Sequence, residues 1–124
     1  MVNSNDFNNI FCLRTKKFGQ SVYKFTDTIK LSESSRNLVR QLSRCSSSVA
    51  ANLRAAARAR SRAEYYSKIC IVVEECDECC FWLDFMKDLS IADEVSRIKL
   101  LEEAEELLKV FSKTKKKLKD NMNR

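Results

Sequence analysis

Apolar residues recur every three or four positions along most of the chain, and this spacing places them on one face of an α-helix. Four such stretches predict helices at residues 5–29, 33–59, 62–87 and 91–120. The first has its apolar face at Phe7, Phe11, Phe18, Val22, Phe25 and Ile29. The fourth has its apolar face at Ile98, Leu101, Ala104, Leu108, Phe111 and Leu118. Four long helices joined by short links predict one all-α domain over residues 1–124, an antiparallel up-down four-helix bundle.

The second stretch is the most strongly divided into two faces. One side of the predicted helix carries Leu38, Leu42, Cys45, Val49, Leu53 and Ala56. The opposite side carries Arg36, Arg40, Arg44, Arg54 and Arg58. This separation is typical of an amphipathic surface helix with one buried face. Arg60 would fall on the apolar side, so we expect the helix to end before it.

Polar residues mark the predicted helix ends. Ser32 is a candidate N-cap, because a serine hydroxyl accepts hydrogen bonds from free backbone N–H groups. Ser61 and Glu64 have the spacing of a capping box, and Ser90 is the expected cap of the last helix. Lysines crowd the end of that helix, where cations suit the negative end of the helix dipole: Lys113, Lys115, Lys116, Lys117 and Lys119.

Composition supports a helical, folded protein. The chain contains no proline, no histidine and one glycine, with 44% hydrophobic and 32% charged residues. The first ten residues lack the basic start and apolar block of a signal peptide. The run "ICIVV" is too short to span a bilayer. We therefore expect a cytoplasmic protein without membrane contact, whose cysteines stay reduced.

Three cysteines fall within seven residues, "EECDECC", and raise the question of a metal or redox site. Cys76, Cys79 and Cys80 lie on the apolar face of the third predicted helix, with Ile69, Val72, Val73 and Leu83. A structural zinc site needs four ligands, whereas a free cysteine packs as a small hydrophobe. We favour core packing and expect no metal, cofactor or disulfide scaffold, with zinc, redox chemistry and disulfides as the alternatives.

The same helix carries a second apolar face, which a bundle helix does not need. It consists of Ile71, Phe81, Trp82 and Phe85, with Glu78 among them. Aromatic side chains are favoured anchors of protein interfaces. We predict an oligomer interface at these five residues; the alternative is that a loop or terminus covers them.

Charge is unevenly distributed along the chain. Residues 31–62 hold seven basic and one acidic side chain, whereas residues 63–108 hold four basic and thirteen acidic ones. The guanidinium group of arginine can donate two hydrogen bonds to the oxygens of one phosphate. The basic face therefore predicts binding of RNA or DNA, with RNA favoured. The candidate contacts are Arg36, Arg40, Arg44, Arg54, Arg58, Arg62, Lys113, Lys115, Lys116, Lys117 and Lys119.

Two alternatives to nucleic-acid binding remain open. The arginines could instead pair with acidic helices, and the protein could be an interaction scaffold or accessory subunit that does not touch nucleic acid. An enzyme is disfavoured and no catalytic residue is predicted, because the chain has no histidine to act as a base and no glycine-rich phosphate loop.

The segment "RQLSRCSSSVAANLRAAARARSRAEYYSKICIVVEECDECCFWLDFM", residues 40–86, resembles a known family. It is the four-helix-bundle family encoded by intervening sequences in bacterial large-subunit ribosomal RNA genes. The residues that carry the resemblance are Gln41, Ser48, Val49, Asn52, Arg60, Ser61, Glu75, Glu78, Trp82 and Leu83. The run "NLRAAAR" departs from the acid and glycine that many members have there.

The resemblance implies a homo-oligomer, a pentameric ring of bundles, without catalytic activity. A related branch comprises the accessory proteins of diversity-generating retroelements, which bind a reverse transcriptase and nucleic acid. The resemblance therefore adds a protein partner such as a reverse transcriptase to the expected partners.

Overall fold

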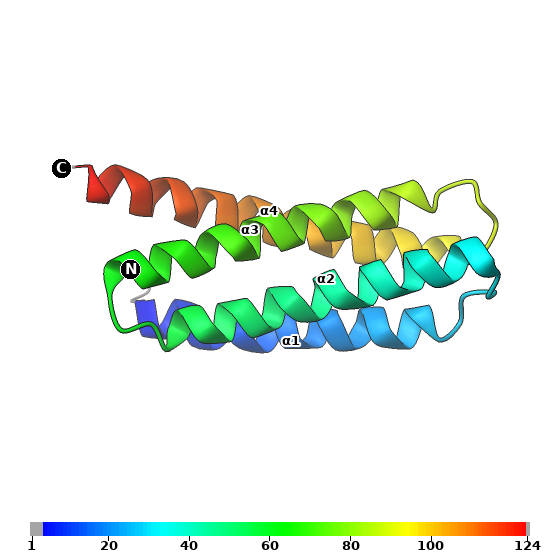
Figure 1. The fold of residues 1–124 in the computed structure, drawn as a ribbon, viewed down its shortest axis with the longest axis horizontal. Coiled ribbons are helices and arrows are strands. Elements are labelled where there is room, and N and C mark those ends of the chain that lie inside the picture. The colour runs from blue at the N-terminus through cyan, green and yellow to red at the C-terminus, as the bar shows by residue number, and fades with distance from the viewer. Residues whose placement is uncertain (1–3, 124) are drawn as a thin grey trace.

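A computed structural model describes residues 4–123, and within them the chain forms four α-helices. These are α1 (Ser4–Thr26), α2 (Glu33–Ala57), α3 (Arg62–Phe85) and α4 (Glu94–Met122). Consecutive helices run in opposite directions along the long axis of the molecule (Figure 1). The all-α four-helix bundle is confirmed, and α2 ends before Arg60 as its position on the helical wheel predicts.

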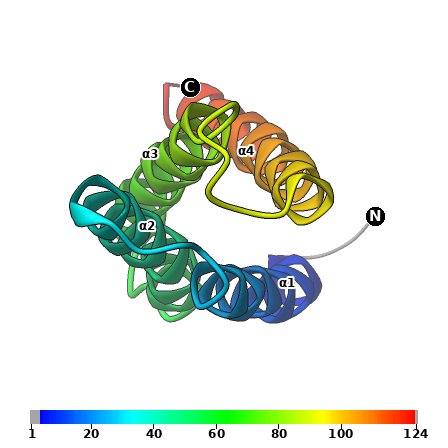
Figure 2. The same ribbon diagram turned by 90° about the vertical axis from the view of Figure 1, so that its right-hand side faces the viewer.

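The four helices form an incomplete circle when they are viewed end-on (Figure 2). Each of α1, α2 and α3 packs along the next helix in the chain, whereas α1 and α4 pack much less closely on each other. The bundle therefore has one loosely closed side, between its first and last helices.

The core lies on the predicted apolar faces of α1, α2 and α3. All six predicted core residues of α2 are buried: Leu38, Leu42, Cys45, Val49, Leu53 and Ala56. The α1 and α2 backbones pass close together at Gly19, where a Cβ would lie in van der Waals contact, 3.4 Å from the carbonyl oxygen of Ser46. The prediction for α4 is partly wrong, since Ile98 is 42% exposed and Leu107 is fully buried instead.

The helix ends show which capping predictions hold. The Ser32 hydroxyl accepts from the backbone N–H of Ser35, and the Ser35 hydroxyl accepts from the backbone N–H of Ser32, at 2.6 Å. Ser61 caps α3 by accepting from the backbone N–H of Glu64. The prediction that Ser90 caps α4 is wrong, because its φ of 57° places Ser90 in a left-handed turn before the helix. Asp93 caps α4 instead, and the hydrogen bonds that it accepts from Ser96 lower the pKa of Asp93.

A buried arginine fastens the start of α4 to the end of α3. Arg97 is only 4% exposed, and its Nη1 donates to the backbone carbonyl oxygen of Leu83 at 2.9 Å. Its Nε donates to the Glu94 carboxylate at 3.0 Å, and this pairing raises the pKa of Arg97. Carbonyl groups in the last turn of a helix have no partner within the helix, so Arg97 satisfies one that would otherwise be unpaired.

Replacing Arg97 with alanine is expected to lower the free energy of unfolding by about 2–3 kcal/mol, because a buried carbonyl loses a charged donor. Urea denaturation followed by circular dichroism measures the change. Arg62→Ala is the matched control, since Arg62 is exposed, and it is expected to change stability by less than about 0.5 kcal/mol. Equal stability of the two variants would contradict the role assigned to Arg97.

The clustered cysteines of α3 face the core. Cys76 and Cys79 are buried, and the Cys79 thiol donates to the sulfur of Cys45 at 3.2 Å. Burial raises the pKa of Cys76 and raises that of the half-buried Cys80 to about 11, so these thiols stay protonated and unreactive. Within residues 4–123, no cluster of three or more histidine, cysteine or acidic side chains is arranged to hold a metal ion. Core packing is confirmed for Cys76 and Cys79.

Candidate nucleic-acid interface

The arginine face of α2 points to solvent as predicted, but its members have different surroundings. Arg44 reaches across to α3, where it forms ion pairs with Glu75, at 3.0 Å, and with Glu78. Arg36, Arg40, Arg54 and Arg58 form no salt bridge with any residue in the described part of the chain. Acidic residues of α3 therefore neutralise one arginine of this face and leave four available.

The antiparallel course of the helices sorts the predicted cations into two ends of the molecule. α2 and α4 run in the same direction, so Arg54, Arg58 and the lysines of α4 lie toward one end, near the start of α3 with Arg62 (Figure 1). The last turns of α4 extend beyond the other helices at this end (Figure 1). Arg36 and Arg40 lie toward the opposite end. The structure therefore separates Arg36 and Arg40 from Arg54, Arg58, Arg62 and the lysines of α4.

A shallow groove runs along the outside of the α1–α2 pair, and Arg54 and Arg58 form part of its wall. This part has a volume of about 690 Å³, and its lining includes small residues of α2: Ala50, Ala51 and Ala57. The groove continues as a second hollow of about 510 Å³, which shares Lys16 and Ala50 with the first and also contains Gly19 and Tyr23. We call the two together the α1–α2 groove.

The α1–α2 groove is positively charged throughout its length. Its charged lining residues are all basic: Lys16, Lys24, Arg54 and Arg58. The charge also acts on the Cys12 thiol in its wall. Burial raises the pKa of Cys12, and the positive charges of Arg54 and Arg58 partly offset that rise. Small residues on the floor allow an incoming chain to approach the backbone. The groove is therefore suited to an extended, negatively charged ligand.

The site includes three residues of α1 that the sequence analysis did not assign to it. Lys16 and Lys24 supply two of the four cations, and Tyr23 is 49% exposed beside them, with its hydroxyl 3.5 Å from that of Ser47. Their position on the polar face of the first helix was a usable signal. The sequence did not show that this face borders the arginines of α2.

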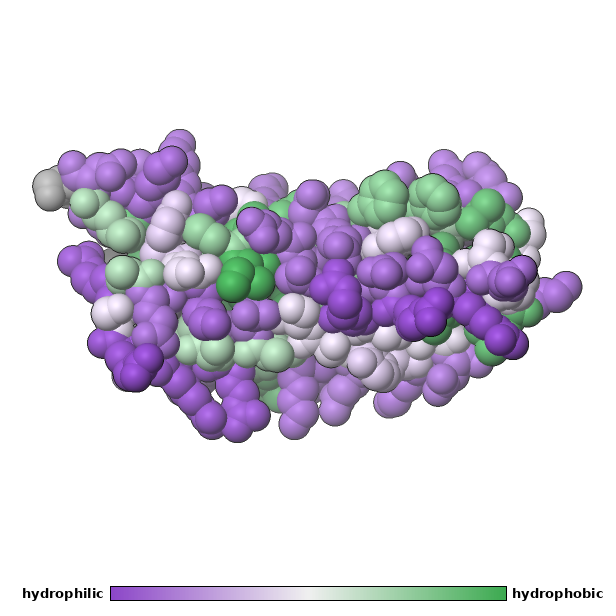
Figure 3. Space-filling view, in the orientation of Figure 1, coloured by the Kyte–Doolittle hydropathy of each residue, from purple (hydrophilic) through white to green (hydrophobic). Residues whose placement is uncertain are grey.

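The predicted oligomer interface is also at the surface. Phe81 and Phe85 are 53% and 54% exposed, and both contact the half-buried ring of Trp82. Apolar side chains gather over the C-terminal part of α3 (Figure 3). Ile71 is partly buried, and Glu78 is engaged by Arg44. No segment within residues 4–123 covers Phe81 and Phe85, so the alternative of a covering loop is not realised there.

Comparison with known proteins places the fold in a family. A model of the family described as 23S rRNA-intervening sequence protein matches residues 8–113. The chain belongs to this family. The resemblance recognised in residues 40–86 is therefore confirmed, whereas the relation to retroelement accessory proteins stays a prediction.

A solved structure agrees with the family assignment. It is the crystal structure of a Bacteroides thetaiotaomicron protein, described as having unknown function and as coming from the S23 ribosomal protein family. The two chains are 23% identical with a TM-score of 0.74, over 88% of this chain and 97% of that chain. At this identity the similarity shows the fold alone. No curated protein matches the chain.

The positions that link this chain to the 23S rRNA-intervening sequence family make contacts within the bundle. Asn52 donates from Nδ2 to the backbone carbonyl and hydroxyl of Ser48, each at 2.9 Å, so its hydrogen bonds stay within α2. Glu75 and Glu78 hold Arg44 between α2 and α3. None of the described helices is long and apolar enough to cross a membrane.

Proposed function

We propose that the chain is a non-enzymatic, homo-oligomeric member of its family that binds nucleic acid, RNA in preference to DNA, in the cytoplasm. The α1–α2 groove is the main contact and the lysine-rich end of α4 is a second one. The observation that carries this proposal is the lining of the groove, whose four charged residues are all cations.

The physical argument combines charge and shape. Each guanidinium or ammonium group along the groove can hold one phosphate of an extended chain. Arg54 and Arg58 lie one helical turn apart, and neither is used in a salt bridge among the described residues. Several copies in one assembly would combine weak contacts through effective concentration. Among the described residues, no carboxylate or histidine lines the groove, and the proposal therefore includes no catalytic step.

Fluorescence anisotropy with a labelled single-stranded RNA tests this proposal. We expect the logarithm of the association constant to fall linearly with the logarithm of salt concentration. Four phosphate contacts on a single strand give a slope of roughly −3. The same sequence as DNA is the control and is expected to bind more weakly. A flat salt dependence, or no binding at about 0.15 M salt, would contradict the proposal.

A protein-interaction scaffold is the second candidate, and the exposed Phe81 and Phe85 favour it. In that case a protein partner, such as the reverse transcriptase that the family resemblance suggests, would remain bound after nuclease treatment. Retention of one stoichiometric partner by a purified chain that binds no RNA would favour the scaffold over nucleic-acid binding.

A further inference from the structure

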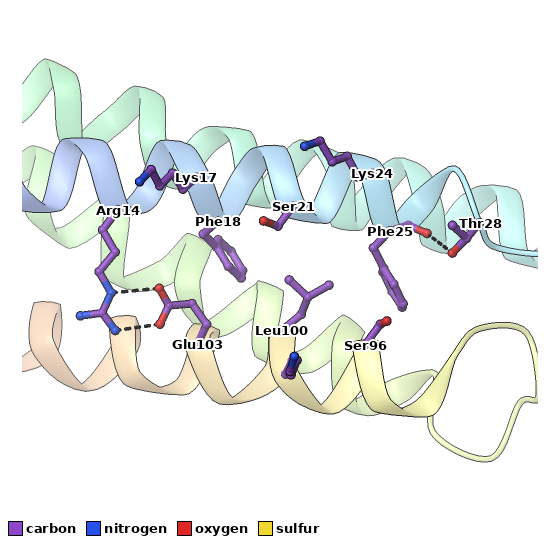
Figure 4. A pocket seen from close by; sticks show the side chains of 11 residues that line it. Arg14, Lys17, Phe18, Ser21, Lys24, Phe25, Thr28, Ser96, Leu100 and Glu103 are labelled. Carbon is purple, nitrogen blue, oxygen red and sulfur yellow. Dashed lines mark hydrogen bonds and ion pairs between the residues drawn. The ribbon is translucent and has the colours of Figure 1, made fainter.

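The loosely closed side of the bundle contains a cleft between α1 and α4 with a volume of about 580 Å³. Phe18 and Phe25 from α1 and Leu100 from α4 project into the space between these helices (Figure 4). Lys17, Ser21 and Lys24 follow one another along α1 at its edge, and Lys99 of α4 also lines it. The α1–α4 cleft therefore has an apolar floor and a basic edge.

Arg14 of α1 forms ion pairs with Glu103 and Glu106 of α4, and the other charged residues that line the cleft are all lysines. Arg14 donates from Nε and Nη2 to the Glu103 carboxylate at 2.9 and 2.7 Å (Figure 4). Lys17, Lys24 and Lys99 have no salt-bridge partner within residues 4–123. The Glu103 carboxylate is paired with Arg14, so the three lysines have no acidic partner among the described residues of the cleft, and a bound partner could supply one by Coulomb attraction.

The outer face of α3 has the complementary properties. Asp77, Phe81 and Asp84 lie on one side of the helix, with Phe85 one turn beyond Phe81. Both aspartates are exposed, and neither forms a salt bridge with a described residue. We call Asp77, Phe81, Asp84 and Phe85 the acidic aromatic face.

The two surfaces also agree in spacing. Asp77 and Asp84 are seven residues apart with an aromatic ring between them, and Lys17 and Lys24 are seven residues apart with the small Ser21 between them. Seven residues of α-helix span about 10.5 Å, so both aspartates can meet lysines while Phe81 lies over Ser21. The α3 helix does not border the opening between α1 and α4 (Figure 2), and no α3 residue lines the cleft, so the acidic aromatic face can meet only the cleft of another copy.

We propose that the acidic aromatic face of one copy docks into the α1–α4 cleft of a second copy. The α3 helix of the partner then lies along α1 and α4 and completes the open side of the bundle. Because the two surfaces differ, the contact is head-to-tail. The docked pair keeps one free face and one free cleft, so further copies can add until a ring closes. This inference rests on the homo-oligomeric part of the proposed function and names both surfaces of its interface.

Light scattering after size exclusion, on nuclease-treated protein free of nucleic acid, tests the contact with two variants. Lys17→Glu/Lys99→Glu reverses charge in the cleft, and Phe81→Ala/Phe85→Ala removes the aromatic rings; all four side chains lie at the surface. We expect the wild type to assemble and each variant alone to run at the subunit mass of 14.4 kDa. Lys113→Glu/Lys116→Glu makes the same charge change on exposed residues elsewhere and is expected to assemble like the wild type.

Mixing the two variants in equal amounts distinguishes a head-to-tail contact from a symmetric one. The Phe81→Ala/Phe85→Ala chain keeps its cleft and the other chain keeps its acidic aromatic face, so the mixture is expected to form particles of twice the subunit mass. A monomeric wild type, a cleft variant that assembles like the wild type, or a mixture that stays monomeric would each overturn the proposal.

The two proposals fail separately in these experiments. Assembly is measured without nucleic acid, and both variants keep all four cations of the α1–α2 groove, including Lys24, which lines the groove and the cleft alike. If the variants still bind RNA, even more weakly than the wild type, the result supports the groove as the RNA site, independently of the mass measurements. Assembly without RNA binding would support the cleft contact and contradict the nucleic-acid proposal.

Discussion

Replacing Phe111 with alanine is expected to lower the free energy of unfolding by about 3–5 kcal/mol, the range for deleting a fully buried phenylalanine. Phe111 of α4 is completely buried, and its ring centre lies 5.5 Å from that of Phe11 and 6.2 Å from that of Phe7. The substitution removes these ring contacts and leaves a cavity between α1 and α4. Urea denaturation followed by circular dichroism measures the loss.

Phe81→Ala is the matched control for Phe111→Ala. It removes the same ring from a second aromatic cluster, but Phe81 is 53% exposed. We expect it to cost less than about 1 kcal/mol, the contribution of its contacts with Trp82 and Phe85. Both substitutions are made in the Lys17→Glu/Lys99→Glu chain, because stability depends on concentration in an assembly. Equal destabilisation by the two changes would show that Phe81 belongs to the core.

Reversing the charge of Arg54 and Arg58 with glutamate is expected to weaken RNA binding at least about a hundredfold. Each arginine supplies a charge-assisted hydrogen bond of about 1.5–3 kcal/mol, and about 1.4 kcal/mol corresponds to a factor of ten. The substitutions also place carboxylates in a groove whose charged lining residues are all basic. Anisotropy titrations at one fixed salt concentration measure the change.

Arg36→Glu/Arg40→Glu is the control for this second prediction. It changes net charge by the same amount on the same helix, but at the end of α2 away from the α1–α2 groove. We expect a reduction of only a few-fold, from the weaker long-range attraction. If both double variants weaken binding equally, RNA responds to the net charge of the chain and the groove is not its site.

The helices could be predicted because each depends on local pattern. Leu38, Leu42, Val49 and Leu53 alone fix the inward face of α2, and all four are buried. Arg97 shows where this reasoning fails. An arginine is normally assigned to the surface, and its burial here is compensated by the Glu94 carboxylate together with the carbonyl of Leu83, which another helix supplies.

The candidate sites depended on tertiary structure to a larger extent. The sequence identified Arg54, Arg58, Phe81 and Phe85 as unusual surface residues, and all four are exposed. The sequence could not identify Lys16 as a neighbour of Arg54 and Arg58, because that depends on how α1 is rotated against α2. It also gave no sign of the α1–α4 cleft, which exists because the first and last helices pack loosely.

Photo-crosslinking tests most directly whether the α1–α2 groove binds RNA. The chain is irradiated with an RNA that contains 4-thiouridine, and the crosslinked peptides are identified by mass spectrometry. We predict crosslinks in residues 16–24 of α1 and 50–58 of α2, with Tyr23 the favoured position because of its exposed ring. Crosslinks confined to α3, or to the lysines at the end of α4, would contradict the account.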